Sequence, residues 1–321
     1  MKKLKLGVGE PGTRFVICYL LFVIWFSSCA GAPKTGLPVT DEELYLLPSG
    51  ARAYLWADAV KARPILEALS FIDLDDKITE QILDSTTSAA AAVFPESQNR
   101  RFFLAAAGNY PRSKANLSLT FSKGWKKQKS NKGSSYWYSK NDALALVVDS
   151  GLALVSNIDP FDYSEKETPP AGFFEFRGTL ALAGWIPGPS GAINNFLNSM
   201  GIPLQIPAED FLFGAARTEN HEEPWELVLK IRTPSASHAR SILSLFSIAR
   251  LFVHSGAAAL GGIAQGTSPQ NAGDLIAPMK VAALLFSNVP EQNEDYLTLR
   301  TGAVSEDQLA LLFGIFQVYS N

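Results

Sequence analysis

Histidine is the side chain most often recruited for acid–base chemistry or metal binding near neutral pH, and this chain of 321 residues has three. His221 lies in the polar run Glu219–Glu223, whereas His238 and His254 stand sixteen positions apart in one predicted helix. None of the three has the HExxH pattern or another close spacing of metal ligands. We therefore expect no metal site. Weak cation binding by His221 and its neighbouring glutamates is the alternative to a solvated turn.

Other patterns that would indicate an enzyme are missing from the sequence. It contains no GxSxG elbow, no P-loop and no dinucleotide-binding glycine pattern. Ser190, in Gly188-Pro-Ser-Gly191, is interpreted as a helix N-cap, and Asp73–Asp76 lacks the glycine and distal glutamate of a calcium loop. The expectation is a protein that is not an enzyme and needs no cofactor.

Cys29 is the residue whose position indicates a defined chemistry, acylation of its thiol. The first fourteen residues are basic, a twelve-residue apolar run, Phe15–Phe26, follows, and small residues surround Cys29. This order is typical of a secretory signal. The run is shorter than the roughly 20 apolar residues that span a bilayer, so an uncleaved anchor is the weaker alternative. The other cysteine, Cys18, lies inside the run, so no disulfide is expected after cleavage.

The segment Phe26-Ser-Ser-Cys29 resembles the lipobox of bacterial lipoproteins, in the relaxed form of spirochaete lipoproteins, because Phe26 stands where leucine is usual. The resemblance implies a signal peptide over 1–28 and a palmitate-type lipid anchor on Cys29. It also implies a place in the cell envelope, on the periplasmic face or at the outer membrane. An ordinary signal-peptidase cut beside Cys29 is the alternative. Residues 29–43, rich in glycine and proline, are predicted to be a flexible tether.

Charge excludes nucleic acid as a partner. Without the four basic residues and one acidic residue of the first 28, the chain keeps 24 basic and 30 acidic residues, a net charge of about −6. Phosphate backbones require clustered lysine and arginine on the protein. The one basic cluster, Lys123–Lys132, is interleaved with Gly, Ser and Asn. It is interpreted as a solvated loop, with contact to anionic headgroups as the functional alternative.

The body from Leu44 onward is predicted to consist of two related halves. Pro111 and Pro234 are 123 residues apart, as are Pro64 and Pro187, and a strand–turn–helix pattern surrounds each member of the first pair. We expect an α+β fold in which each half is a mainly antiparallel sheet with helices packed on one face. The predicted bounds are 44–157, a linker at 158–170, and 171–321. Two unrelated runs of strands and helices are the alternative.

Individual elements follow from apolar runs and their flanking turn residues. In the first half, strands are expected at 102–108, 135–138, 143–148 and 152–155, and a helix at 112–121. In the second half, strands are expected at 225–231, 281–286 and 296–300, with helices at 235–254 and near 309–316.

The helix predicted over 235–254 is the candidate site for an apolar ligand or a membrane. Its apolar arc is far wider than the roughly 100° that a surface helix needs. A glycine-rich loop, 256–266, follows it. Burial between a sheet and another element explains the arc as well as a groove or a membrane interface does. The candidate contact residues are Ile242, Leu245, Phe246, Ile248, Leu251 and Phe252.

The predicted architecture is similar to treponemal outer-membrane lipoproteins that carry amphipathic helices on an α/β core, and to duplicated lipoproteins with lipid-binding cavities. The function expected is therefore non-enzymatic: an envelope lipoprotein, held to the membrane by its N-terminal lipid, that binds a lipid or another apolar ligand or contacts the membrane through amphipathic helices. A scaffolding lipoprotein that binds another envelope protein is the alternative.

Overall fold

The computed structural model describes residues 42–68, 83–94, 101–122, 124–141, 143–163, 165–191, 194, 205–220, 224–247, 250, 288–305 and 308. The chain divides into two compact units, Met1–Thr168 and Pro169–Asn321. The division falls inside the segment predicted to join two halves. Each unit combines an antiparallel sheet with a few helices, so the predicted α+β class is confirmed. An internal duplication stays a prediction.

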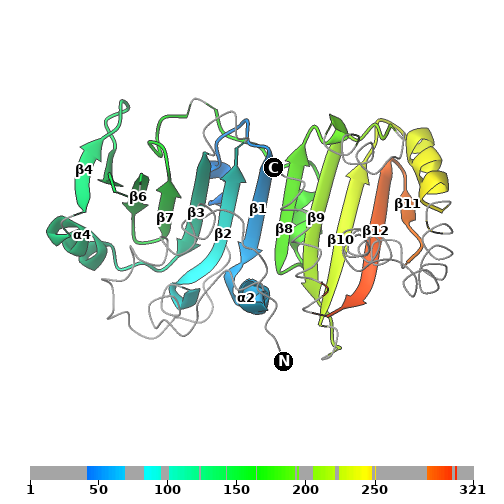
Figure 1. Ribbon diagram of the computed structural model, residues 1–321, viewed down its shortest axis with the longest axis horizontal. Helices are drawn as coiled ribbons and strands as arrows, with labels where there is room; N and C mark the ends of the chain where they lie inside the picture. Colours follow the sequence, from blue (N-terminus) through cyan, green and yellow to red (C-terminus); the bar gives the residue numbers. More distant parts are fainter. Residues whose placement is uncertain are drawn as a thin grey trace, which may run out of the picture. The chain divides into compact units, whose positions relative to one another are not determined.

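The first unit is built on an antiparallel sheet with the strand order β1-β2-β3-β7-β6-β5-β4 (Figure 1). The strands are β1 (Ala53–Asp58), β2 (Thr86–Val93), β3 (Phe102–Gly108), β4 (Trp125–Lys129), β5 (Ser135–Ser139), β6 (Leu144–Val148) and β7 (Leu152–Ser156). Two α-helices, α2 (Ala59–Ala68) and α4 (Arg112–Phe121), and a short 3₁₀ helix, η2 (Leu44–Leu46), complete the described part. β4 pairs with β5 alone among the described strands and so ends this sheet.

α4 covers one face of the sheet. Residues Ala115 and Leu119, four positions apart, point from α4 into an apolar core made by alternate residues of β3, β5, β6 and β7. Trp137 and Leu146 are direct cross-strand partners in this core. One face of the helix is therefore buried against the sheet, and the rest of its surface is accessible to solvent or to a partner.

The chain enters the first unit through a buried segment. Leu44 and Leu47 are fully buried. The Tyr54 hydroxyl accepts a hydrogen bond from the Ala51 backbone N–H at 3.1 Å and lies 3.0 Å from the Pro48 carbonyl oxygen. Glu43, at the end of the predicted tether, is also fully buried, so the folded body already includes it.

The second unit has an antiparallel sheet with the order β8-β9-β10-β12-β11. Its strands are β8 (Leu182–Pro187), β9 (Asp210–Arg217), β10 (Trp225–Arg232), β11 (Glu291–Asn293) and β12 (Tyr296–Val304), and α5 (Phe173–Arg177) precedes them. A helix over 236–247 (yellow in Figure 1) follows β10. Within the described residues, no helix is long and apolar enough to cross a membrane.

Candidate functional site

The helix predicted as the contact site uses its apolar side chains, as far as they are described, against its own sheet. Ile242 is 2% exposed and packs with Ile231 and Leu297. Phe246 is half-buried against the same cluster, and Leu245 is also half-buried. Ile248, Leu251 and Phe252 lie outside the described residues, so a lipid-contacting role for the helix stays a prediction.

The cysteine and the histidines considered as candidate site residues do not come together in the described part of the chain. Cys29, His221 and His254 lie outside the described residues. His238 is exposed, and its Nδ1 lies 2.8 Å from the Ser235 hydroxyl at the start of the helix. Among the described residues, no three His, Cys, Asp or Glu side chains converge in a way that could hold a metal ion.

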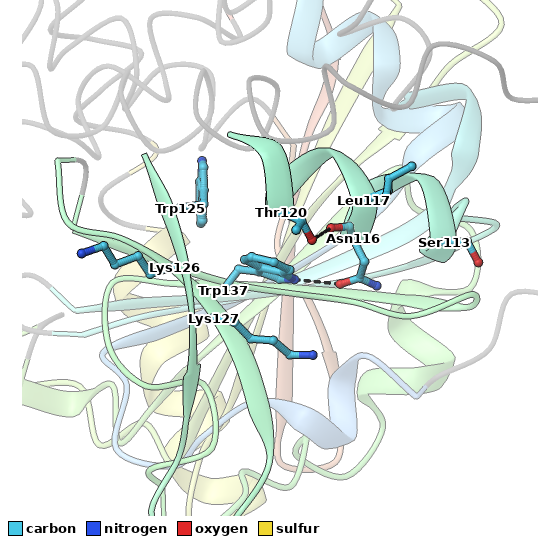
Figure 2. Close-up of a pocket in the computed structure, with 8 residues that line it drawn as sticks. All are labelled: Ser113, Asn116, Leu117, Thr120, Trp125, Lys126, Lys127 and Trp137. Atoms are coloured by element: carbon cyan, nitrogen blue, oxygen red, sulfur yellow. Dashed lines mark hydrogen bonds between the residues drawn. The ribbon is translucent and has the colours of Figure 1, made fainter. Parts of the chain in front are cut away.

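An open groove of about 590 Å³ lies between α4 and the last two strands of the first unit's sheet. Figure 2 shows its eight lining residues, four from α4, three from β4 and one from β5. They are Ser113, Asn116, Leu117, Thr120, Trp125, Lys126, Lys127 and Trp137. Its volume lies within the range of about 300–1,000 Å³ that is usual for small-molecule sites.

Two tryptophans form the apolar part of this groove. Trp125 and Trp137 belong to the same buried cluster, and each is 8% exposed. The Trp137 indole N–H donates to the Asn116 side-chain oxygen at 2.7 Å, which joins β5 to α4 (Figure 2). The Asn116 side-chain N–H group donates in turn to the Arg112 carbonyl oxygen at 2.9 Å. The indole is thereby held in one orientation.

Two lysines of β4, Lys126 and Lys127, line the groove, and they point to opposite faces of the strand. Lys126, Lys127 and Lys129 are exposed, and Lys127 lies directly opposite Trp137 in the strand register. None of these ammonium groups is paired with a carboxylate among the residues that the structure describes. The interpretation of 123–132 as a loop is wrong, because 125–129 form the strand β4, paired with β5. Lysine is a usual residue on edge strands, where it discourages pairing with other chains.

The outer surface of α4 carries two exposed apolar side chains beside these lysines. Leu117 is 60% exposed and Phe121 is 78% exposed. They stand two positions after Ala115 and Leu119, a rotation of about 200° around the helix, so they point away from the core. Because they are four positions apart, they lie on one face and form a continuous apolar stripe.

Acidic residues lie near the opposite face of β5. Tyr136 is buried there, its hydroxyl donates to Gln128 Oε1 at 2.9 Å, and burial together with the charges of Asp159 and Asp162 raises the pKa of the phenol. Asp149 is paired with Arg112 at the start of α4, with Arg112 Nη1 3.1 Å from Asp149 Oδ1.

The region around the groove combines an antiparallel sheet, an outer strand with three lysines and a helix with two exposed apolar side chains. Residues 40–151, about a third of the chain, match the family described as outer membrane-associated lipoprotein TP0453. The matched region contains every residue of the groove. No curated protein matches the chain.

Solved structures agree with the match. Crystal form III of TP0453 superposes with a TM-score of 0.50 at 17% identity, covering 85% of this chain and 98% of the other. Crystal form IV gives 0.51 at 18% identity, covering 91% and 100%. These likenesses establish the fold. The resemblance to treponemal envelope lipoproteins expected from the sequence is confirmed.

Proposed function

We propose that this lipoprotein is not an enzyme and that it contacts its membrane through α4, with the lipid on Cys29 as a tether. The apolar stripe of Leu117 and Phe121 carries the proposal, because two large apolar side chains exposed side by side are costly in water unless a partner covers them. The open groove beside α4, with its polar rim, favours contact with a membrane surface over enclosure of an apolar ligand.

The packing of α4 supports this orientation. Ala115 and Leu119 fix the helix on the sheet, so Leu117 and Phe121 can enter a bilayer interface without any part of the core unfolding. A helix that lies in the interface buries its apolar face about 5–10 Å into the headgroup and acyl boundary. The tryptophans at the base of the groove are of the type that is enriched at that level of a membrane.

Replacing both apolar residues should release the protein from membranes. Full burial of a Leu or Phe side chain is worth about 1.5–3 kcal/mol, so we expect Leu117→Ser/Phe121→Ser to weaken partition by about 3 kcal/mol, or roughly a hundredfold. The measurement is flotation with phosphatidylcholine vesicles. The protein is the mature chain 29–321 carrying Cys29→Ser, so that no acyl chain contributes.

The matched control is Val60→Ser. Val60 is 77% exposed on α2 in the same unit, so the substitution removes an exposed apolar side chain, smaller than the two of the double variant, from another helix. Circular dichroism checks that all variants remain folded. Equal flotation of the double variant and the parent would contradict the proposal. Retention of an envelope protein by the parent in place of vesicles would favour the scaffolding alternative.

Cys29 has its own expected result in cells of the source organism. Cys29→Ser in the full chain should abolish incorporation of radiolabelled palmitate and leave the signal segment unprocessed at that position. Labelling that persists in the variant would place the lipid elsewhere.

A further inference from the structure

We infer that the groove between α4 and β4 is a headgroup site that takes the phosphate of an anionic phospholipid in a bilayer. The inference rests on the proposed membrane contact and adds its lipid specificity. Three features carry it: lysines that line the groove and have no carboxylate partner within the described part of the chain, a tryptophan base held by a hydrogen bond, and the adjoining apolar stripe of α4.

The first feature is charge. The mature chain is acidic, yet Lys126, Lys127 and Lys129 follow one another along a single strand of five residues. A fourth lysine, Lys132, donates to the Tyr163 carbonyl oxygen and stands over the Tyr163 ring, so it is already engaged. The three β4 lysines have no such contact among the described residues. Lys127 and Lys129 share the face of β4 that carries Trp125, whereas Lys126 lies on the other face. Their charge is complementary to an anionic surface, and lysine is a common ligand of phosphate.

The second feature is the position of the polar groups around the groove. Lys127 lies opposite Trp137 across the β4–β5 ladder, and both line the groove. Ser113, from the first turn of α4, lines the other end of the groove (Figure 2). Thr120 donates its hydroxyl proton to the Asn116 carbonyl oxygen at 2.7 Å, which leaves its lone pairs for a hydroxyl of a glycerol headgroup. The groove can thus receive a phosphate at its lysines and a polyol along α4.

The third feature is the depth at which the groove would lie in the membrane interface. Leu117 lines the groove and also belongs to the apolar stripe with Phe121. When the stripe enters the bilayer interface, the groove is carried to the level of the headgroups, and the β4 lysines come within reach of their phosphates. A soluble phosphate compound would gain nothing from this apolar stripe, which is why we assign the site to a lipid.

The test compares vesicles of phosphatidylcholine alone with vesicles containing 30% phosphatidylglycerol, using the mature chain with Cys29→Ser. A lysine near an anionic surface contributes about fivefold to binding, so Lys126→Gln/Lys127→Gln should lower affinity for the anionic vesicles roughly 20-fold. Binding to phosphatidylcholine should not change. Added salt should weaken the parent on anionic vesicles and have much less effect on this variant.

The charge-matched control is Lys166→Gln/Arg217→Gln. Both residues are exposed, lie outside β4, and give the same change in net charge. If this control loses as much affinity as the β4 variant, net charge explains the effect and the inference is overturned. Equal binding of the parent to both vesicle types overturns it too, while leaving membrane contact through Leu117 and Phe121 intact.

Two further outcomes distinguish failure of the headgroup site from failure of the proposed membrane contact. If the parent binds neither vesicle type, the proposed membrane contact fails and the headgroup site fails with it. If millimolar glycerol phosphate releases the parent from anionic vesicles and changes the fluorescence of the parent but not of Trp137→Phe, the groove binds a soluble phosphate compound. That result overturns the assignment to a bilayer lipid.

Discussion

Gly108→Ala is expected to destabilise the first unit by about 3 kcal/mol, because the new methyl group would overlap backbone that cannot move independently. A Cβ at Gly108 would meet the carbonyl oxygen of Ser85 and would lie 3.0 Å from Thr86 Cα. The same carbonyl accepts the Asn109 N–H at 2.8 Å, and the Gly108 N–H donates to the Gly151 carbonyl oxygen at 3.0 Å. Both bonds hold the end of β3 where the chain turns towards α4.

Gly151→Ala is the matched control, since a Cβ there meets nothing within 4 Å. We expect it to change the unfolding free energy by less than about 0.5 kcal/mol. Urea unfolding followed by tryptophan fluorescence measures both variants, with separate transitions fitted if the two units do not unfold together. Equal stability of the two variants would mean that the β2–β3 backbone yields to the methyl group. In that case α4 is held less rigidly than its contacts indicate.

Much of the first unit could be predicted from its residues. The strand predicted at 102–108 and the helix predicted at 112–121 coincide with β3 and α4. The first is an apolar run, and the turn residues Asn109–Pro111 separate it from the second. β4 was not predicted. Its residues, Trp125–Lys129, contain three lysines and show no apolar alternation, because an edge strand is paired on one side and needs little apolar surface.

The proposed contact surface is harder to predict than the fold. Leu117, Leu119 and Phe121 alternate with Ser118 and Thr120, a pattern that in isolation is typical of a strand. In a helix the three cannot share one face, so one turns inward and two turn outward, and the sequence does not say which. Leu119 is 2% exposed, whereas Phe121 is 78% exposed. The choice depends on where the sheet lies, and that is a long-range property.

The wide apolar arc of the second unit's helix predicts a contact site there, and no comparable signal is present in the sequence of α4. A helix that covers a sheet needs a broad apolar face, and Ile242 and Phe246 are used in this way. A helix that contacts a partner is better recognised by apolar residues that remain exposed after folding. Such residues can be identified only when it is known which residues form the core. The hydrogen bond between Trp137 and Asn116 is equally hard to predict, because its partners are 21 residues apart in the sequence.

Glu43 should make the first unit less stable as pH rises, the reverse of the usual behaviour of a carboxylate. The side chain is fully buried, and burial raises its pKa above the ordinary value of 4.5, although hydrogen bonds from Ser88 and Trp56 oppose the shift. Both donors bond to Oε1, at 2.7 and 3.0 Å, while Oε2 has no hydrogen-bond partner in the described part of the chain. A raised pKa in the folded chain means that folding favours the protonated acid.

The sign of the effect follows from proton linkage. Below the unfolded pKa, Glu43 is protonated in both states and contributes no penalty. As pH rises past about 4.5, the unfolded chain ionises first, so the free energy of unfolding falls until the folded carboxyl ionises as well. Above that pH the loss is constant.

The variant Glu43→Gln separates the pH dependence of stability that arises from Glu43 from that of all other titrating groups. Glutamine keeps an oxygen that can accept from Trp56 and Ser88 but carries no proton equilibrium, so its stability relative to the parent should rise as pH increases from 4 to 8. Glu43→Leu removes the acceptor and should cost about 1–3 kcal/mol at every pH. Urea titrations of the three proteins at matched pH values give the comparison. If the parent and Glu43→Gln differ by the same amount throughout, Glu43 does not exchange its proton on unfolding, and its buried position is held by its hydrogen bonds alone.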